Sequence, residues 1–452
     1  MVSRKVTILG AGESGTGAAL LAKSKGYDVF VSDFGKIKDS YKKELTDAGI
    51  AYEEGKHSTD IIFESSLIIK SPGISEKADI IKKAQAKNIQ FIDEIEFAAQ
   101  YTTAKIIAIT GTNGKTTTTL LTYHLLKEAG LNVGLAGNVG QSLAKQIVED
   151  KYDYYVVEMS SFQLDGTVYF KPFIGVLLNI TPDHMDRYDY KLSNYVDSKF
   201  QLVSNMAEDD HFIYYTDNVL IQEGVGKRSI KAQLHPVSLK EGVAVSTVNG
   251  EMVFEGGFKV DQQDTVLRGE HNAINMMAAI SAARILGVDE ESIRQSLKTF
   301  KNAPHRMEYV ATINNVDFVN DSKATNVDAV KYALDSFNTP LVWIAGGIDK
   351  GNDYSLVMES VNAKVKALVC LGKDNSKLRD AFHEQIINLL ETDNIKDAVR
   401  SALGYAEAHD VVLLSPACAS FDLFKNYEDR GDQFKQAVLE LKQEFESKAL
   451  KQ

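Results

Sequence analysis

The chain has 452 residues, which is more than one hydrophobic core usually serves, so we expect about three domains. Its net charge of −12 argues against a nucleic-acid partner, because phosphate backbones attract Lys- and Arg-rich surfaces. Two cysteines cannot supply a disulfide framework or a cysteine-based zinc site. No apolar run approaches the roughly 20 residues of a membrane span. We therefore predict a cytoplasmic protein without a membrane partner. We also expect a monomer.

The first segment, residues 1–96, alternates expected strands and helices. A strand over Lys5 to Leu9 leads into the turn Gly10-Ala11-Gly12-Glu13-Ser14-Gly15, a helix begins at Ala18, and a second strand ends at Asp33. This alternation predicts a Rossmann-like, doubly wound parallel sheet. The three glycines with Asp33 fit the dinucleotide fingerprint, which taken alone indicates a nicotinamide-dependent dehydrogenase. The same turn would bind any diphosphate, including that of a nucleotide sugar.

The second segment, residues 97–302, opens with a phosphate-binding pattern. An apolar run over Ile106 to Ile109 precedes Gly111-Thr112-Asn113-Gly114-Lys115-Thr116-Thr117, and a helical pattern follows. A strand, a glycine-rich turn and a helix cradle a triphosphate through backbone N–H groups. Lys115 can reach the outer phosphates and Thr116 can ligate magnesium. The segment is thus expected to be a P-loop-type ATPase domain, although Ile109 stands where the full Walker pattern has its first glycine.

Two further residues of this segment follow expected buried strands. The strand over Tyr154 to Val157 ends on Glu158, and a strand over Ile174 to Ile180 leads to His184. Ligands of open α/β sheets bind at the carboxyl ends of the strands, so both side chains should share a crevice with Thr116 and hold magnesium. Taken singly, Glu158 is better read as a helix N-terminal acid and His184 as a capping or turn residue. Asn249-Gly250 later predicts a hairpin, and with it a small antiparallel sheet added to the parallel one.

Lys199 lies at the centre of an apolar helical face. That face consists of Leu192, Tyr195, Val196, Leu202 and Val203. Burial would lower the pKa of the amine. A neutral amine can add carbon dioxide and become a carbamate, which could ligate a second magnesium ion. The residues alone favour a simpler interpretation, a surface lysine whose stem lies along apolar neighbours.

The third segment, residues 303–452, again reads as a Rossmann-like α/β domain. Expected buried strands cover Leu341 to Ala345, Ala367 to Leu371 and Val411 to Leu414, and a last helix covers Asp432 to Glu446. Polar loops follow three expected strands, and they suggest a second ligand-binding face. Taken singly, each loop is better read as ordinary solvated turn chemistry. The three loops are Asp321 to Asn326, Ala345 to Gly351 and Ser415 to Asp422.

Four motifs of this chain together resemble those of the Mur ligase family. They are the phosphate loop, Asp321-Ser322-Lys323-Ala324-Thr325-Asn326, Ser71-Pro72-Gly73 and Ser160-Ser161-Phe162-Gln163. The resemblance covers all three segments and points to the member that adds D-glutamate. It implies ATP-dependent joining of D-glutamate to UDP-N-acetylmuramoyl-L-alanine through an acyl phosphate, in peptidoglycan synthesis. The implied cofactors are ATP, two Mg²⁺ ions and a carbamate on Lys199.

The resemblance also implies roles for individual residues. Catalytic residues would be Lys115, His184, Lys199 and Lys350. ATP would contact Gly111, Thr112, Asn113, Gly114, Lys115, Thr116, Thr117, Asn272, Arg306 and Asp321. One magnesium ion would bind Thr116 and Glu158, and the other His184 and carbamylated Lys199. The UDP-substrate would contact Glu13, Ser14, Asp33, Phe34, Ser71, Gly73, Asn138, Ser160 and Lys323. D-glutamate would contact Thr325, Lys350, Ser420, Phe421 and Tyr427.

Two positions depart from the family pattern: Tyr427 stands where phenylalanine is expected, and Phe34 where a smaller polar residue is familiar. Three alternatives to the D-glutamate ligase remain open. They are a ligase for another amino acid or for folate, a nicotinamide oxidoreductase built on the first segment, and a nucleotide-gated binding module without catalysis.

Overall fold

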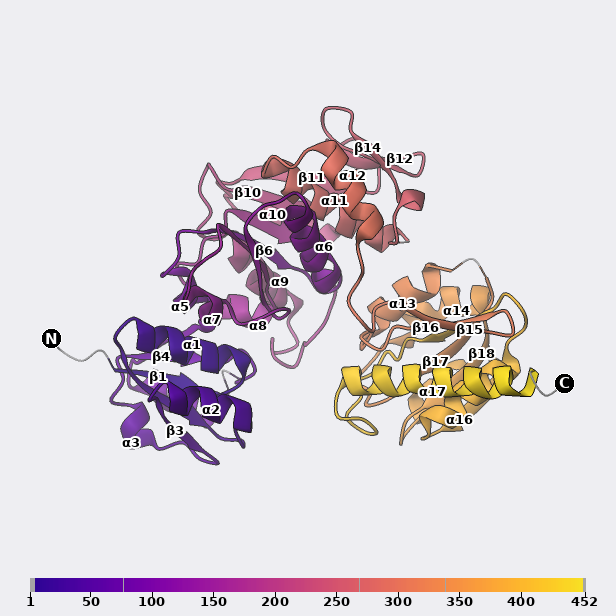
Figure 1. Cartoon of the computed structure of the whole chain (residues 1–452), viewed down its shortest axis with the longest axis horizontal. Helices are drawn as coiled ribbons and strands as arrows, with labels where there is room; N and C mark the ends of the chain where they lie inside the picture. The colour runs from indigo at the N-terminus through magenta and orange to yellow at the C-terminus, as the bar shows by residue number, and fades with distance from the viewer. Residues whose placement is uncertain (1–4, 76, 268, 338, 450–452) are drawn as a thin grey trace. The chain divides into compact units, whose positions relative to one another are not determined.

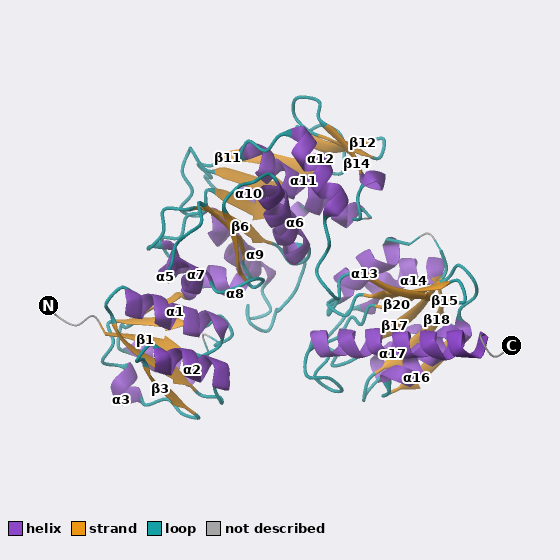
Figure 2. Cartoon of the chain, in the orientation of Figure 1, coloured by secondary structure: helices purple, strands orange, loops and turns teal. Residues whose placement is uncertain are grey.

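The computed structural model describes residues 5–75, 77–267, 269–337 and 339–449. The chain divides into two compact units, Met1–Leu267 with Asn272–Phe300 and Arg268–His271 with Lys301–Gln452 (Figure 1). Helices flank the strands in each unit, as expected for an α/β protein (Figure 2).

The N-terminal part of the first unit is a five-stranded parallel sheet of order β3-β2-β1-β4-β5. Its strands are β1 Lys5–Leu9, β2 Asp28–Asp33, β3 Ala51–Glu54, β4 Leu67–Lys70 and β5 Gln90–Asp93, and its helices are α1 Glu13–Ser24, α2 Asp39–Asp47, α3 Thr59–Ile62, α4 Asp79–Ala86 and α5 Glu94–Ala99. Helix α1 begins earlier than the predicted Ala18. A Cβ added at Gly15 would lie 1.8 Å from the Gly10 carbonyl oxygen, so glycine allows the first turn of α1 to pack on the glycine-rich turn.

The central part of the first unit is a nine-stranded sheet of order β14-β13-β12-β11-β10-β9-β6-β8-β7. The strands from β7 to β12 are parallel, and β12, β13 and β14 are antiparallel. The predicted antiparallel strands therefore exist, but they extend the edge of the main sheet. The strands are β6 Lys105–Thr110, β7 Val133–Gly137, β8 Tyr154–Glu158, β9 Ile174–Leu177, β10 His211–Tyr215, β11 Gln233–Ser238, β12 Val245–Val248, β13 Glu251–Val253 and β14 Lys259–Asp261.

The helices of this part are α6 Lys115–Glu128, α7 Leu143–Ile147, α8 Ser161–Asp165, α9 Leu192–Phe200, α10 Val219–Gly226, α11 Glu270–Ile285 and α12 Glu290–Thr299, with 3-10 turns at Gln201–Val203 and Gln262–Asp264. Strand β9 ends at Leu177, short of the predicted Ile180. Beyond it the chain leaves the sheet, because Asn179 turns to bond the phosphate loop: its carbonyl oxygen accepts from the Thr112 amide at 2.9 Å.

The N-terminal and central parts of this unit share one hydrophobic core, in which α1, α5 and α7 pack together. Glu94 is buried at this junction, where its Oε1 accepts hydrogen bonds from Ser142 Oγ at 2.7 Å and from the Ala144 amide at 2.6 Å. Burial raises the pKa of Glu94 to about 7. The shared core fixes the glycine-rich turn of the first sheet relative to the central sheet.

The second unit is a six-stranded sheet of order β15-β16-β20-β17-β18-β19, antiparallel only between β15 and β16. Its strands are β15 Glu308–Ile313, β16 Val316–Asn320, β17 Leu341–Ala345, β18 Val365–Leu371, β19 Asn388–Thr392 and β20 Val411–Leu414. Its helices are α13 Val327–Asp335, α14 Met358–Lys364, α15 Ser376–Phe382, α16 Ile395–Tyr405 and α17 Tyr427–Ala449, with a 3-10 turn at Tyr354–Val357. One core cluster packs α13, α14 and α15 on the sheet, and another packs α16 and α17 on it.

Helix α17 begins earlier than the predicted Asp432, because the Asn426 side chain accepts a hydrogen bond from the Asp429 amide at 2.7 Å and caps the first turn. Within the described residues, no helix combines the length and the apolar composition needed to cross a membrane.

Candidate ATP and substrate sites

The phosphate loop joins β6 to α6 and depends on Gly114. This residue has a φ of 83° and immediately precedes the first turn of α6. This left-handed conformation favours glycine, and a Cβ at Gly114 would also lie 2.3 Å from Asn275 Oδ1, so a larger residue would displace the Asn275 amide. Asn275 Nδ2 in turn donates to Asn272 Oδ1 at 3.1 Å. The start of α11 therefore lies against the phosphate loop, and with it Asn272, which was predicted to contact ATP.

Asn275 is a residue of this site that the sequence reasoning missed. It lies three residues after Asn272, so the two amides share one helical face. That spacing was available in the sequence and could have identified it.

The segment after β9 braces the phosphate loop. The Asn113 amide donates to Asn179 Oδ1 at 2.8 Å, and Thr112 Oγ1 donates to the Thr181 carbonyl at 3.0 Å. These bonds fix the conformation of the loop. The positive end of α6 is thereby held where it can meet an anion.

Lys115 and Lys199 meet at the base of this loop. Each amine donates to the Gly111 carbonyl oxygen at 2.9 Å; Lys115 also donates to the Thr112 carbonyl at 2.7 Å, and Lys199 to Thr110 Oγ1 at 3.0 Å. Lys199 is only 1% exposed, so the interpretation of a surface lysine is wrong. The apolar face of α9 carries the amine inward onto the loop, where polar groups satisfy its hydrogen bonds.

The surroundings of Lys199 favour its neutral form. Burial lowers the pKa of Lys199 well below that of an ordinary lysine, and the positive charge of Lys115 lowers it further. The carboxylates of Asp183, Asp165 and Glu158 act in the opposite direction but do not outweigh burial. A neutral amine is a nucleophile, whereas an ammonium group is not.

Glu158 ends β8 beside this pair of lysines. It is 4% exposed, and its buried Oε2 has no hydrogen-bond partner within the described residues. The amide of Asn138, which follows β7, donates to the Glu158 carbonyl at 3.1 Å. A buried carboxylate oxygen without a partner is costly, and a bound cation would satisfy it.

His184 lies beyond the end of β9 with a φ of 52° and a partly exposed side chain. Its ring packs against Phe162 of α8, the helix that follows Glu158, with the ring centroids 5.0 Å apart. Ser160 lies between Glu158 and Phe162 in the sequence, and its hydroxyl and backbone form a capping box with Gln163 at the start of α8. His184 and Ser160 therefore belong to the same end of the sheet as Glu158.

The described residues contain no group of three His, Cys, Asp or Glu side chains placed to hold a metal ion. Magnesium commonly binds through one or two carboxylates together with substrate phosphates and water. Buried Thr116 and the unpartnered oxygen of Glu158 fit that kind of site.

A pocket of about 810 Å³ opens at the carboxyl ends of the N-terminal strands. Four of the predicted UDP-substrate residues line it: Asp33, Phe34, Ser71 and Gly73. Glu13 and Ser14, at the start of α1, are not among the described residues that line it, and Glu13 Oε1 instead accepts from the Ser142 amide at 3.2 Å. The Asp33 carboxylate accepts from the Ala11 amide at 2.6 Å and the Gly35 amide at 2.7 Å. Asp33 thus stabilises the glycine-rich turn.

In the second unit, the three polar loops contact one another, with the loop Ser415 to Asp422 bonded to each of the other two. Asp321 Oδ2 accepts from Ser415 Oγ at 3.0 Å, and the amides of Ile348 and Ala419 exchange hydrogen bonds with each other's carbonyls. Burial raises the pKa of Asp321 to about 7, while Arg306 acts against this shift. The Nε of Arg306 is buried without a hydrogen-bond partner in the described part of the chain. These loops form one polar face.

Arg430 holds this face together, and the sequence reasoning missed it. The side chain is 1% exposed; its Nε donates to Ser322 Oγ at 2.9 Å, its Nη2 to the Ser322 carbonyl at 2.9 Å, and its Nη1 to the carbonyls of Gly346 and Cys418 at 3.3 and 3.2 Å. Burial lowers its pKa to about 10, so it stays charged at neutral pH. In the sequence Arg430 is surrounded by acidic residues and resembles a surface ion-pair partner.

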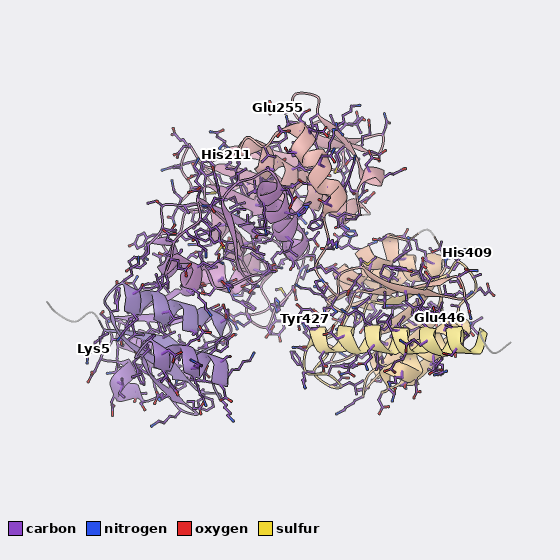
Figure 3. All side chains as sticks on the ribbon, viewed as in Figure 1. Lys5, His211, Glu255, His409, Tyr427 and Glu446 are labelled. Carbon is purple, nitrogen blue, oxygen red and sulfur yellow. The ribbon has the colours of Figure 1, made fainter. Side chains whose placement is uncertain are left out.

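The predicted D-glutamate residues lie on this face. Tyr427 lies at the first turn of α17 (Figure 3). The Lys323 ammonium lies 5.4 Å from the Tyr427 ring centroid, and Ser322 Oγ donates to the Tyr427 carbonyl at 2.8 Å. Lys350 and Phe421 are exposed on neighbouring loops. Ser420 is buried, and Thr325 is half-buried.

The fold and these sites define an ATP-dependent ligase class built from three α/β segments. Three family models match the chain: the MurD N-terminal domain over residues 5–80, the Mur ligase middle domain over 109–283, and the Mur ligase, glutamate ligase domain over 305–418. The chain belongs to the Mur ligase family. The predicted resemblance is confirmed, and the glycine-rich turn belongs to a Mur ligase domain.

Relatives named UDP-N-acetylmuramoylalanine–D-glutamate ligase match almost the whole chain. That of Cytophaga hutchinsonii is 51% identical over 448 residues, covering 97% of this chain and 100% of the relative. That of Bacteroides fragilis is 49% identical over 443 residues, again covering 97% and 100%.

Among solved structures, the UDP-N-acetylmuramate-alanine ligase of Thermotoga maritima matches with a TM-score of 0.62 at 18% identity, covering 97% of this chain and 100% of that one. A pseudomurein peptide ligase type C from Methanothermus fervidus matches with a TM-score of 0.63 at 20% identity and the same coverage. These two similarities concern the fold.

Proposed function

We propose that this chain joins D-glutamate to UDP-N-acetylmuramoyl-L-alanine with ATP, giving the extended nucleotide-peptide, ADP and phosphate in peptidoglycan synthesis. The observation that carries the proposal is the sequence identity of 51% and 48% to two UDP-N-acetylmuramoylalanine–D-glutamate ligases, each over 97% of this chain. The phosphate loop, with the Lys115 and Lys199 amines at its base, supplies chemistry of the required kind.

The family to which the chain belongs implies the following reaction. The alanyl carboxylate attacks the γ-phosphorus and ADP leaves, which gives an acyl phosphate. The D-glutamate amine then attacks the acyl carbon, and the tetrahedral intermediate expels phosphate and leaves an amide. Phosphoryl transfer needs positioning and charge neutralisation more than covalent help from the protein. Lys115 and the first turn of α6 supply both.

The proposed reaction would use two magnesium ions. Thr116 and Glu158 would hold one, and the unpartnered Oε2 of Glu158 supports this assignment. His184 and Lys199 in carbamate form would hold the other. When bound, the ions would neutralise charge on the phosphates and on the reacting carboxylate.

The Lys199 carbamate rests on three features of the amine: it is buried, its hydrogen bonds place it at the phosphate loop, and its pKa is lowered. The neutral nitrogen adds to carbon dioxide and releases one proton. The product carries two oxygen acceptors and a negative charge in place of an ammonium donor. A cationic neighbour, Lys115, favours that anion.

The remaining substrates follow the predicted assignments. The pocket of the N-terminal sheet would take the uridine nucleotide, with Asn138, Ser160 and Lys323 toward the muramoyl arm. The polar face of the second unit would take D-glutamate, where exposed Lys350 suits the side-chain carboxylate. Asn272, Arg306 and Asp321 would serve ATP. The cytoplasmic location and the monomeric state stay predictions.

An amino-acid panel tests the proposal. Phosphate release from ATP is measured with UDP-N-acetylmuramoyl-L-alanine and D-glutamate, L-glutamate or L-lysine. We expect release with D-glutamate and background with the other two, without any nicotinamide absorbance change. Release with L-lysine instead would make the chain a different amino-acid ligase, and slow hydrolysis that ignores D-glutamate would make it a binding module.

A further inference from the structure

Two aromatic side chains stand at one end of the N-terminal pocket. Phe34 directly follows β2 and is 73% exposed, and His57 lies beyond the end of β3. Both line the pocket, with their ring centroids 5.8 Å apart and their planes tilted by 41°. A large aromatic side chain left so exposed offers a stacking surface to a flat ligand.

A hydrogen-bond chain behind the pocket fixes the tautomer of His57. Glu53 accepts hydrogen bonds from the Ser58 amide and hydroxyl, at 2.7 and 2.5 Å, and from Ser32 Oγ at 2.7 Å. Burial opposes ionisation of Glu53, but these hydrogen bonds outweigh it and its pKa is lowered. Since a carboxylate only accepts, the single Ser32 proton goes to Glu53.

The Ser32 oxygen must then accept from its other neighbour. His57 Nδ1 lies 2.7 Å from Ser32 Oγ, so Nδ1 carries the proton and donates it. Burial lowers the pKa of His57, while the carboxylates of Glu53 and Asp33 oppose this shift. The ring is therefore neutral, and its Nε2 is an acceptor. No hydrogen bond joins that nitrogen to any other residue in the described part of the chain.

We propose that His57 reads the base of the nucleotide substrate, with Nε2 accepting the N3–H of uracil while Phe34 stacks on the ring. This deepens the proposed function and rests on its assignment of the pocket to a uridine nucleotide. Uracil carries a donor at N3, whereas cytosine carries a lone pair there. An acceptor fixed by Ser32 and Glu53 therefore selects uridine and rejects cytidine. Asp33 is less suited to this task, since both its oxygens already accept from backbone amides.

Equilibrium binding of UDP-N-acetylmuramoyl-L-alanine and of its cytidine counterpart to the full chain tests the inference. ATP and D-glutamate are left out, so the result does not depend on ligase activity. We expect the wild type to bind the uridine form about tenfold or more tightly, because the cytidine form leaves two acceptors facing each other. His57→Ala should bring the two affinities to within about twofold of each other.

Two matched variants separate base reading from a structural role. His57→Gln offers both a donor and an acceptor, so it should also bind the two forms about equally. Phe34→Ala removes the stacking surface but leaves the hydrogen bond between His57 and Ser32, so it should weaken both forms alike and keep the preference for uridine. Equal binding of both forms by the wild type, or an unchanged preference in His57→Ala and His57→Gln, would overturn the inference. If the preference for uridine depends on His57 but the amino-acid panel shows no D-glutamate ligase activity, the proposed function is wrong and the inference about His57 is supported.

Discussion

Replacing Lys199 by alanine should reduce D-glutamate-dependent phosphate release by about 10³-fold or more. Lys199 is the amine that donates to Gly111 and Thr110 at the base of the phosphate loop, and its carbamate would be a ligand for magnesium. Alanine removes the nitrogen on which the carbamate forms, so high bicarbonate should not restore activity. Added short carboxylates should restore part of it by supplying the missing oxygen ligand.

The matched control is Lys191→Ala, which removes an exposed lysine at the N-terminal end of the same helix. Lys191→Ala should keep near wild-type turnover, because the Lys191 side chain is exposed, whereas that of Lys199 is buried and bonds the phosphate loop. Near-normal activity in Lys199→Ala would show that the carbamate assignment is wrong.

Lys115→Ala should abolish ATP use, by about 10³-fold or more, while leaving the affinity for the UDP-substrate within about twofold of wild type. Lys115 begins α6 and donates to the Gly111 and Thr112 carbonyls, so its loss removes a cation from the phosphate loop. The pocket lined by Asp33 and Phe34 belongs to the N-terminal sheet and keeps its own contacts.

Phosphate release and calorimetric binding of UDP-N-acetylmuramoyl-L-alanine give the two readouts. Lys127→Ala, an exposed lysine in the last turn of α6, serves as the control and should change neither. If Lys115→Ala lost ATP use and UDP-substrate binding equally, the assignment of the two nucleotides to separate sites would be wrong.

Much of the fold could be predicted because its signals are local. Apolar runs that end on glycine-rich or polar residues predicted β1, β6, β8 and β20 and the loops that follow them. Element boundaries were less certain, because tertiary contacts set them. Helix α1 extends back to Glu13 since Gly15 packs on Gly10, and β9 stops at Leu177 since Asn179 bonds to the phosphate loop.

The site divides in the same way. Lys115 and Thr116 carry a pattern that specifies their position, whereas the burial of Lys199 depends on α9 packing over the loop, which periodicity alone could not decide. Arg430 and His57 were missed because their roles arise from partners far apart in the chain. Arg430 bonds residues of three loops, and His57 depends on Ser32 of the neighbouring strand.

The most direct measurement of the central claim, that ATP activates the alanyl carboxylate of the nucleotide substrate, is oxygen-isotope transfer. The enzyme is incubated with ATP, D-glutamate and UDP-N-acetylmuramoyl-L-alanine that carries oxygen-18 in its alanyl carboxylate. Mass spectrometry then measures the oxygen-18 content of the released phosphate. Through an acyl phosphate, one labelled oxygen leaves with each phosphate, because amide formation breaks the bond between carbon and that oxygen. Phosphate free of label would show that water attacked ATP instead, and would contradict the proposed ligase chemistry.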